Sequence, residues 1–401
     1  MRKYFSFVFI SLCLSVSTML FADWGMGSPF IYLKGFINKN GEVVIKPQYR
    51  DVQQYSDGLA AVKFTLVDGK IVDEFTTNKA LDEGKLNVEI TYKWGFIDTT
   101  GKVVIQPQYD DVLPFSEGLA AVMNLKEPKQ PMWGYINTKG KMVIPQMYER
   151  VESFNDGIAC VRIMISGNEG YYGYIDKKNK YIIQPKYPVA YPFYEGLAYV
   201  AVKGIGKQLD GYFMNIKEEV VIPLKDMGYS GTEFREGWLC VLKKVGPGLY
   251  IRSFLDKTGQ PVFTHNDIKY YEGKSIGISS ALSEGIMVVG SEGKSGYALK
   301  TGEVIIPPQY SEAFMFRDGL GLVVNITDLR KISREYEIPL SELYSMDTFI
   351  YLDKTGEKIL EISKYTITNC KNNTKNKLYG HIEKAEPFSE GYAVILIRRG
   401  K

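Results

Sequence analysis

Eight acidic residues that each precede a glycine are the most regular side chains in this sequence that could do chemistry. They are found in Asp57-Gly58, Glu117-Gly118, Asp156-Gly157, Glu195-Gly196, Glu236-Gly237, Glu284-Gly285, Asp318-Gly319 and Glu390-Gly391. A ring of such carboxylates could bind cations, because carboxylate oxygens are ligands for hard metal ions. In a turn, the same carboxylates accept hydrogen bonds from nearby backbone. Since every acid has the same place before a glycine, we favour local backbone capping.

Pairs of an aromatic residue and glycine form a second pattern, in Trp94-Gly95, Trp133-Gly134 and Tyr172-Gly173. An exposed aromatic ring could stack on a sugar. More often such a ring packs on a neighbouring unit, while the glycine lets two backbones approach closely. We therefore interpret these pairs as structural.

The sequence contains two histidines, His265 and His381, and neither lies in a metal-binding or nucleophile motif. A zinc site needs several closely spaced His or Cys ligands, and phosphate-binding loops, serine elbows and EF-hand loops are also missing from the sequence. Glycoside hydrolysis needs only two carboxylates, but no acid stands out as a departure from the regular pattern. We predict a non-catalytic protein without a cofactor or metal.

Four cysteines are present, at positions 13, 160, 240 and 370. Cys160 and Cys240 occupy the position of Ala121 in the related segments GLAAV, GIACV and GWLCV. This equivalence predicts small buried core residues. Cys370 lies in the polar segment TNCKNNTKNK and is the better candidate for a free, reactive thiol.

The elements that carry these residues are copies of one stretch, residues 93–123, KWGFIDTTGKVVIQPQYDDVLPFSEGLAAVM. KWGFID and KVVIQP are rich in aromatic and β-branched residues and flank the turn sequence DTTG, which predicts a β-hairpin. The run LAAV adds a third strand, and YDDVLPF a fourth if it also pairs. The unit is therefore predicted to be entirely β.

This unit recurs eight times. The aromatic residue of its first strand recurs as Phe36, Phe96, Tyr135, Tyr174, Phe213, Phe254, Tyr297 and Tyr351. The hairpin turn recurs from Asn38, Asp98, Asn137, Asp176, Asn215, Asp256, Leu299 and Asp353. Where Asn179 replaces the turn glycine, it is the next-best residue for a left-handed backbone. The strand aromatic, the hairpin turn and the acid-glycine pair keep the same order in every unit, which excludes a chance pattern.

These features resemble the WG-repeat family, also called KWG repeats. The resemblance rests on Trp94-Gly95, Trp133-Gly134 and Tyr172-Gly173 with the turn and VVIxPQY that follow, and it covers residues 35–401. The later units depart from it at Asp210-Gly211, Arg252-Ser253, Ser295-Gly296 and Phe349-Ile350. The family is defined by its repeats and has no shared catalytic residues, so the resemblance implies a fold more than a function.

Residues 1–22 have the pattern of a secretory signal peptide. Arg2 and Lys3 precede an apolar run that ends at Phe21-Ala22. The alternatives are an uncleaved anchor and, through Cys13, a lipoprotein. Cleavage after Ala22 would lower the net charge from +3 to +1, because it removes two basic residues and no acid. A nearly neutral chain lacks the charge of a nucleic-acid-binding protein, and we expect an exported protein.

Three insertions interrupt the repeats after a short lead-in at residues 23–34. In residues 65–93 the stretch KLNVEITYK alternates apolar and polar side chains, which predicts a lengthened hairpin. Residues 325–348 predict a short helix or two, and the Asn- and Lys-rich residues 366–384 predict a mobile loop. The first two follow the same strand of the unit, so they should project from one face, which is often the binding face. The tyrosines beside them, Tyr92, Tyr336 and Tyr344, are the candidate contact residues.

About 39 residues with three or four strands is the size of a propeller blade, and closure into a ring would remove exposed strand edges. We therefore favour an all-β, propeller-like ring over an open β-solenoid. The predicted function is an exported binding or scaffolding module that presents a protein-interaction surface. An envelope hydrolase and a glycan-binding protein are the alternatives.

Overall fold

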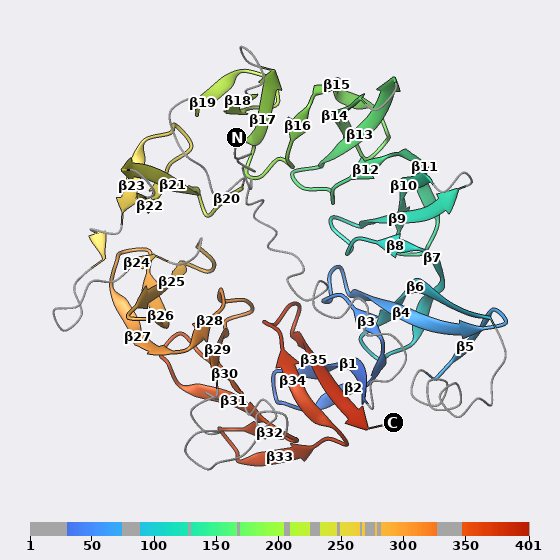
Figure 1. The fold of residues 1–401 in the computed structure, drawn as a ribbon, viewed down its shortest axis with the longest axis vertical. Helices are drawn as coiled ribbons and strands as arrows, with labels where there is room; N and C mark the ends of the chain where they lie inside the picture. Colours follow the sequence, from blue (N-terminus) through green and yellow to red (C-terminus); the bar gives the residue numbers. More distant parts are fainter. Residues whose placement is uncertain are drawn as a thin grey trace, which may run out of the picture.

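The computed structural model describes residues 30–73, 89–126, 130–166, 169–203, 209–224, 233–246, 249–264, 267–268, 277–278, 282–326 and 347–400. These residues form 35 β-strands and no α-helix. The strands make eight small antiparallel sheets arranged as a ring (Figure 1). The favoured reading, a β-propeller with eight blades, is thus confirmed over the open solenoid.

Each blade begins with a short inner strand and ends with an outer strand at the rim (Figure 1). From inner to outer strand, blade 1 contains β34 (His381–Ala385), β35 (Tyr392–Gly400), β1 (Phe30–Asn38) and β2 (Val43–Tyr49). Blade 2 contains β3 (Asp51–Val52), β4 (Leu59–Val67), β6 (Ile90–Asp98) and β7 (Val103–Tyr109), with β5 (Lys70–Val72) beside β4. Blade 3 contains β8 (Asp111–Val112), β9 (Leu119–Lys126), β10 (Gln130–Asn137) and β11 (Met142–Tyr148). Blade 4 contains β12 (Arg150–Val151), β13 (Ile158–Ser166), β14 (Glu169–Asp176) and β15 (Tyr181–Tyr187).

The second half of the ring repeats this order. Blade 5 contains β16 (Val189–Ala190), β17 (Ala198–Lys203), β18 (Leu209–Met214) and β19 (Val220–Pro223). Blade 6 contains β20 (Phe234–Arg235), β21 (Trp238–Gly246), β22 (Leu249–Leu255) and β23 (Pro261–Thr264). Blade 7 contains β24 (Gly277–Ile278), β25 (Ile286–Ser291), β26 (Lys294–Leu299) and β27 (Val304–Tyr310). Blade 8 contains β28 (Glu312–Ala313), β29 (Gly321–Asn325), β30 (Thr348–Leu352), β31 (Lys358–Ser363), β32 (Thr366–Asn369) and β33 (Thr374–Lys377).

Blade 1 closes the ring because it is built from both ends of the described chain. Strand β1 pairs antiparallel with β35 over nine residues, from Phe30 opposite Gly400 to Asn38 opposite Tyr392. The N-terminal part thus supplies the two outer strands, and the C-terminal part supplies the two inner strands. The repeat in the sequence is consequently offset from the blade in the structure. Its WG hairpin forms the third and fourth strands of one blade, and its DV and LAAV segments form the first and second strands of the next.

The blades are held together by apolar contacts between neighbours. Each of eight hydrophobic clusters contains residues from two adjacent blades. In a typical interface the Phe96 ring of blade 2 packs on Phe115 of blade 3, with centroids 4.9 Å apart. Such an aromatic pair recurs at seven interfaces, and Leu282 takes the place of the second ring at the eighth. The recurring aromatic residue of the unit is therefore structural.

The glycine of the WG pair allows the outer strand to cross closely over the strand before it. A Cβ atom added at Gly173 would lie 2.7 Å from the backbone oxygen of Ile183. Gly95 and Gly134 face the equivalent backbone at 2.6 Å and 2.5 Å. Trp94 itself is 5% exposed and lies in the cluster between blades 2 and 3. The structural interpretation of the WG pair agrees with this geometry.

The two ends of the strands define two faces of the ring. We call the end with the acid-glycine turns and the WG hairpin turns the corner face. The opposite end, where the second strand of each blade connects to the third, is the insertion face. Because the strands of each blade alternate in direction, the last residues of β4 and β29, after which the first two insertions follow, both lie on the insertion face. The two insertions therefore leave their blades at the same face, as predicted.

On the corner face the acids join the blades. Each of the eight carboxylates accepts a hydrogen bond from a backbone N–H of the acid-glycine turn in the next blade, at 2.6–3.2 Å. In five cases a lysine in the hairpin turn of the next blade also donates to the backbone carbonyl oxygen of the acidic residue. These lysines are Lys39, Lys177, Lys257, Lys300 and Lys354. Local capping was thus the wrong interpretation. The acids are structural, but their partners lie on a neighbouring blade.

The hairpin turns on the corner face follow the expected chemistry. The first residue of seven turns, such as Asp98, accepts backbone N–H bonds from the second and fourth residues after it. Where Asn179 and Glu218 replace the turn glycine, both keep a positive φ of 64°. Their side chains accept hydrogen bonds from Tyr148 and Tyr187 of the preceding blade. Each replacement side chain thus gains a hydrogen bond to the preceding blade that a glycine could not accept.

Candidate binding site on the insertion face

The 65–93 insertion was predicted to be a lengthened hairpin, but its described residues leave β4 at nine residues, the length of β13 in blade 4, and add a strand instead. Strands β4 and β6 pair without a break from Leu59 opposite Asp98 to Val67 opposite Ile90. After Val67 the chain turns at Asp68 and Gly69, which both have positive φ, and returns as β5 along the other edge of β4. The insertion therefore adds a short strand to blade 2 at the insertion face.

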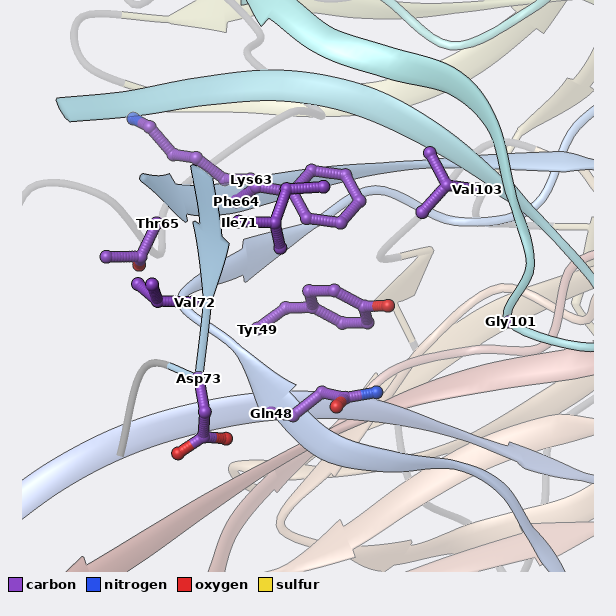
Figure 2. Close-up of a pocket in the computed structure, with 10 residues that line it drawn as sticks. All are labelled: Gln48, Tyr49, Lys63, Phe64, Thr65, Ile71, Val72, Asp73, Gly101 and Val103. Carbon is purple, nitrogen blue, oxygen red and sulfur yellow. The ribbon is translucent and has the colours of Figure 1, made fainter. Parts of the chain in front are cut away.

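Strand β5 forms one wall of a pocket between blades 1 and 2. The pocket has a volume of about 370 Å³. Its residues are Gln48, Tyr49, Lys63, Phe64, Thr65, Ile71, Val72, Asp73, Gly101 and Val103. Figure 2 shows the ring of Tyr49, the ring of Phe64 and the side chain of Ile71 around one space, with Gln48 and Asp73 at its edge. Small-ligand and side-chain pockets have this size and mixed lining.

The pocket floor is rigid and aromatic. The Tyr49 and Phe64 rings meet edge to face, with centroids 5.5 Å apart. Both residues are buried, and burial raises the pKa of the Tyr49 hydroxyl. Ile71 on β5 is 45% exposed, so it offers apolar surface at the mouth. The pocket can therefore hold an apolar side chain while Lys63 and Asp73 provide charged groups at its wall and edge.

Tyr92, a predicted contact residue, lies on β6 opposite Thr65, one of the pocket residues. The Arg50 guanidinium lies over its ring, with the Cζ atom 4.5 Å from the centroid. A cation over an aromatic face orients the ring, so Tyr92 is half-buried and held in place beside the insertion. The structure thus places Tyr92 next to the pocket without making it a lining residue.

Tyr336, Tyr344 and the helices expected in the 325–348 insertion lie outside the described residues. The third insertion, residues 366–384, was predicted to be a mobile loop, and this was wrong for residues 366–369, 374–377 and 381–384, which lie in strands β32, β33 and β34. Strand β32 pairs with β31 and with β33, which widens blade 8 to six strands. The side chains of Asn369 and Asn376 donate to backbone oxygens of Asn40 and Gly41 in blade 1. These bonds explain why a polar segment is ordered.

Sequence reasoning missed the pocket residues Tyr49 and Ile71. Tyr49 belongs to the repeated PQY segment, so its type carried no sign of a special role. Ile71 lies in the insertion but outside its alternating stretch, residues 85–93, so no sequence signal pointed to it.

The cysteines separate into two environments. Cys160 and Cys240 are buried at interfaces between blades, as their equivalence to alanine predicted. Burial raises the pKa of both thiols, that of Cys240 to about 11. Cys370 is exposed and unbonded to another cysteine, but its pKa is also raised, first by desolvation and then by Glu361. Its environment therefore does not favour the reactive thiolate.

Within the described ranges, three or more His, Cys, Asp or Glu side chains nowhere gather in a way that could hold a metal ion. The eight corner carboxylates are spread around the ring and engaged with backbone N–H groups. The described part of the chain also contains no helix with the length and apolar character needed to cross a membrane.

Comparison with known proteins bears on the family. A family model described as "WG containing repeat" matches residues 35–64, 94–125, 133–163, 172–204 and 296–325. No curated protein matches the sequence.

Several solved structures resemble the fold at low identity. A structure described as the eukaryotic initiation factor is 8% identical, with 80% of this chain and 89% of that chain covered and a TM-score of 0.41. The β-propeller domain of the Trilobed protease from Pyrococcus furiosus is 13% identical, with 79% and 97% covered and a TM-score of 0.45. A prolyl endopeptidase structure is 8% identical, with 80% and 48% covered and a TM-score of 0.41. Likeness at this level carries no conclusion about activity.

Proposed function

Because the chain is a WG-repeat protein folded as an eight-bladed propeller, we propose that it is a non-catalytic scaffold that binds a protein partner through its insertion face. The observation that carries the proposal is the pocket between blades 1 and 2, which exists because β5 of the insertion covers the side of β4. A structural repeat body alone would not need this added strand.

Exposed apolar side chains at the same face support the proposal. They lie at the ends of second strands, or just beyond them, in blades 2, 3, 4 and 8: Ile71, Leu125, Met164, Ile165 and Ile326, each 45–57% exposed. Exposed apolar surface framed by polar residues is typical of protein-interaction sites. Side chains spread over several blades suit an extended protein surface better than a single small ligand.

The pocket gives this surface a specific anchor. An apolar side chain of the partner would enter between Tyr49, Phe64 and Ile71, and Tyr92 would contact the partner beside it. Burying one such side chain contributes about 1.5–3 kcal/mol, and central aromatic and arginine residues dominate the energy of many interfaces.

We also propose that the protein is exported and acts in the cell envelope or outside the cell, on the basis of the signal-peptide pattern in residues 1–22. Edman sequencing of the protein recovered from the exported fraction should begin at Asp23. Retention of an intact N-terminus in the cytoplasm would refute export.

The test uses residues 23–401 and a photo-crosslinking amino acid at position 92. We expect crosslinks to one protein from envelope extracts, and none from the same residue placed at Lys139, in a hairpin turn on the corner face. A second variant replaces residues 68–89 with Asn-Gly, a two-residue turn that suits the paired Val67 and Ile90. This variant should fold normally and lose the crosslink.

Equal crosslinking from positions 92 and 139 would contradict the proposal, and so would retention of the partner after β5 is removed. Hydrolysis of an envelope polymer by the purified chain would instead favour the enzyme alternative. Circular dichroism and thermal unfolding of the variant without β5 are the folding control.

A further inference from the structure

Strand β5 has one unpaired edge beside the pocket between blades 1 and 2. It pairs with β4 over three residues, and its middle residue, Ile71, lies opposite Leu66. Among the described residues no other strand pairs with β5. A sheet edge of this kind is a template for a further strand. We call it the free edge of β5.

The turn before β5 decides which backbone groups point to the free edge. Asp68 and Gly69 both have positive φ, as in a two-residue type I′ turn. In such a hairpin the pair next to the turn, Val67 and Lys70, exchanges hydrogen bonds, and the following pairs alternate. The N–H and C=O of Ile71 therefore point away from β4. Within the described part of the chain they have no hydrogen-bond partner.

The side chain of Ile71 lies on the pocket side of the sheet, together with Phe64 and opposite Tyr49 of blade 1 (Figure 2). A strand that pairs with β5 would place the residue directly opposite Ile71 on the same side. The Tyr49 and Phe64 rings, with centroids 5.5 Å apart, would then contact that residue. An apolar side chain at this one position would enter the pocket.

The shape of the pocket suits an extended chain. Its lining residues run from Ile71 on β5 to Gly101, which lies in a hairpin turn of the corner face. Strand β5 itself runs from the insertion face toward the corner face, so a chain paired with it would continue along the pocket. On the blade 1 side, Gln48 is exposed at the pocket edge and has no hydrogen bond within the described ranges. Its amide can donate to a peptide carbonyl oxygen.

The charge beside the free edge is positive. Lys70 is exposed on β5, and no carboxylate of the described residues forms an ion pair with it. Its side chain points to the opposite side of the sheet from that of its neighbour Ile71. An acidic residue next to the apolar residue of the added strand would face Lys70, and opposite charges on paired strands are favourable.

A second pocket, of about 490 Å³, lies at the seam between blades 8 and 1 and differs in its backbone. It is formed by the ends of β1 and β35, the start of β34 with His381, and the β31–β32 turn. Strands β1 and β35 pair with each other up to Phe30 and Gly400, and the Ile382 N–H donates to Lys364 O at 2.6 Å. These backbone groups are already bonded. An extended peptide is therefore better suited to the pocket beside β5.

We propose that the partner binds through an extended segment that adds an antiparallel strand to the free edge of β5. One apolar side chain of the segment lies opposite Ile71 in the pocket, and an acidic residue next to it pairs with Lys70. Main-chain hydrogen bonds give such complexes affinity, and the side-chain pocket gives them specificity. This proposal rests on the protein-binding function proposed above and adds the form in which the partner is recognised.

A library of random linear dodecapeptides displayed on phage provides the probe. It is selected on residues 23–401 and counter-selected on the variant in which Asn-Gly replaces residues 68–89. We expect enriched peptides with alternating polar residues around one apolar residue that has an acidic neighbour. Isothermal titration then measures the affinity of a selected synthetic peptide.

N-methylation of that peptide separates strand addition from other binding modes. The N–H of the apolar residue faces Ile71 O in the proposed pairing, so its methylation should weaken binding at least about tenfold. The N–H groups of the two neighbouring residues point away from β5. Their methylation should change the affinity less than about twofold. Equal losses at the three positions would overturn the proposal.

Two substitutions at position 71 test the same bond from the side of the protein. Ile71→Pro removes the N–H at the free edge but no bond to β4, and proline is tolerated at such edge positions. It should weaken peptide binding about tenfold, while Ile71→Val, which keeps the N–H, should bind within about twofold of the unmodified chain. Lys70→Gln should weaken binding about twofold. Circular dichroism and thermal unfolding of each variant are the folding controls.

Equal binding by Ile71→Pro and Ile71→Val, when both are folded, would overturn the proposal. So would selected peptides with apolar residues at helical spacing, or peptides that bind equally without β5. If position 92 crosslinks to a protein but no linear peptide is enriched, the strand addition is wrong and the protein-binding function stands. If neither a crosslink nor a peptide is found, both proposals fail.

Discussion

The corner face and the insertion face of this propeller are made by the same strands, but only the corner face repeats the same turn geometry in every blade. On the corner face eight turns repeat one geometry, and each is bonded to the next around a closed circle. On the insertion face the connections differ in length. One pocket begins beside β5 and extends along the side of the blade as far as Gly101, and the other lies at the seam between blades 8 and 1. The difference indicates that the corner face adds a repeated set of polar contacts between blades to the apolar contacts, and that the other face is free to acquire binding elements.

The physical cause is the location of the contacts between blades. At the corner face, backbone N–H groups and side chains of one blade bond to the next, so a turn of altered length would break contacts on both sides. At the insertion face, by contrast, the strands β13 and β14 that flank a connection pair with each other as far as Ser166 and Glu169. Both residues belong to the same blade. A longer connection there disturbs only its own hairpin.

The largest effect is expected from lengthening a turn on each face. Six Gly/Ser residues inserted between Asp156 and Gly157 should remove the bonds to Glu117 and Gly196 and loosen Phe154, which packs on Tyr135. We expect a loss of at least about 3 kcal/mol in the free energy of unfolding, because several contacts between blades fail together.

The same six residues inserted after Ser166 should cost less than about 1 kcal/mol, since the entropy of closing a loop rises slowly with its length. Urea unfolding followed by intrinsic fluorescence measures both. Equal losses for the two insertions would show that the faces do not differ in the way we describe.

How far the sequence predicted this arrangement depends on the range of the contacts. Local chemistry was sufficient for the hairpins, because Asp98 and Gly101 specify their own turn. The ring was predicted from the repeat length and number. Partners from other blades could not be predicted. Glu117 bonds to Gly157, and the sequence around Glu117 does not indicate which residue of another blade it contacts. This is why the acids were assigned to local capping.

The closing blade and the pockets were missed for related reasons. Residues 23–34 were interpreted as a lead-in, yet Phe30 onwards pairs with the C-terminal strand β35, a contact between opposite ends of the chain. Strand β33, TKNK, contains only polar residues, and β32, TITN, contains one apolar residue, so hydrophobic alternation gave little signal. His381 was dismissed for lack of a motif, although its surroundings come from three separate segments.

A smaller effect is expected from a single bond of the corner circle. Glu117→Ala removes the acceptor of the Gly157 N–H and the ion pair with Lys177, whose Nζ lies 3.0 Å from Glu117 Oε2. We expect a loss of about 1 kcal/mol in the free energy of unfolding. The Glu117→Gln variant keeps an acceptor oxygen and should lose less, so the pair separates hydrogen bonding from charge. If both variants were as stable as the unmodified chain, the circle would contribute nothing measurable.

The smallest effect concerns pH and the hairpin turns of the corner face. The hydrogen bond from the Thr100 hydroxyl is the main cause that lowers the pKa of Asp98, and backbone N–H bonds from Thr100 and Lys102 add to it. A carboxyl whose pKa is lowered by folding stabilises the folded state above its unfolded pKa, near 3.8, and this contribution disappears as the pH falls through the folded pKa. Asn137 accepts the same backbone bonds in blade 3 without titrating. Asp98→Asn should therefore match the unmodified chain's stability at pH 7 closely and lose less of it between pH 5 and pH 2. Thermal unfolding across this range measures the difference, and an identical pH dependence would mean that the turn acid does not link protonation to folding.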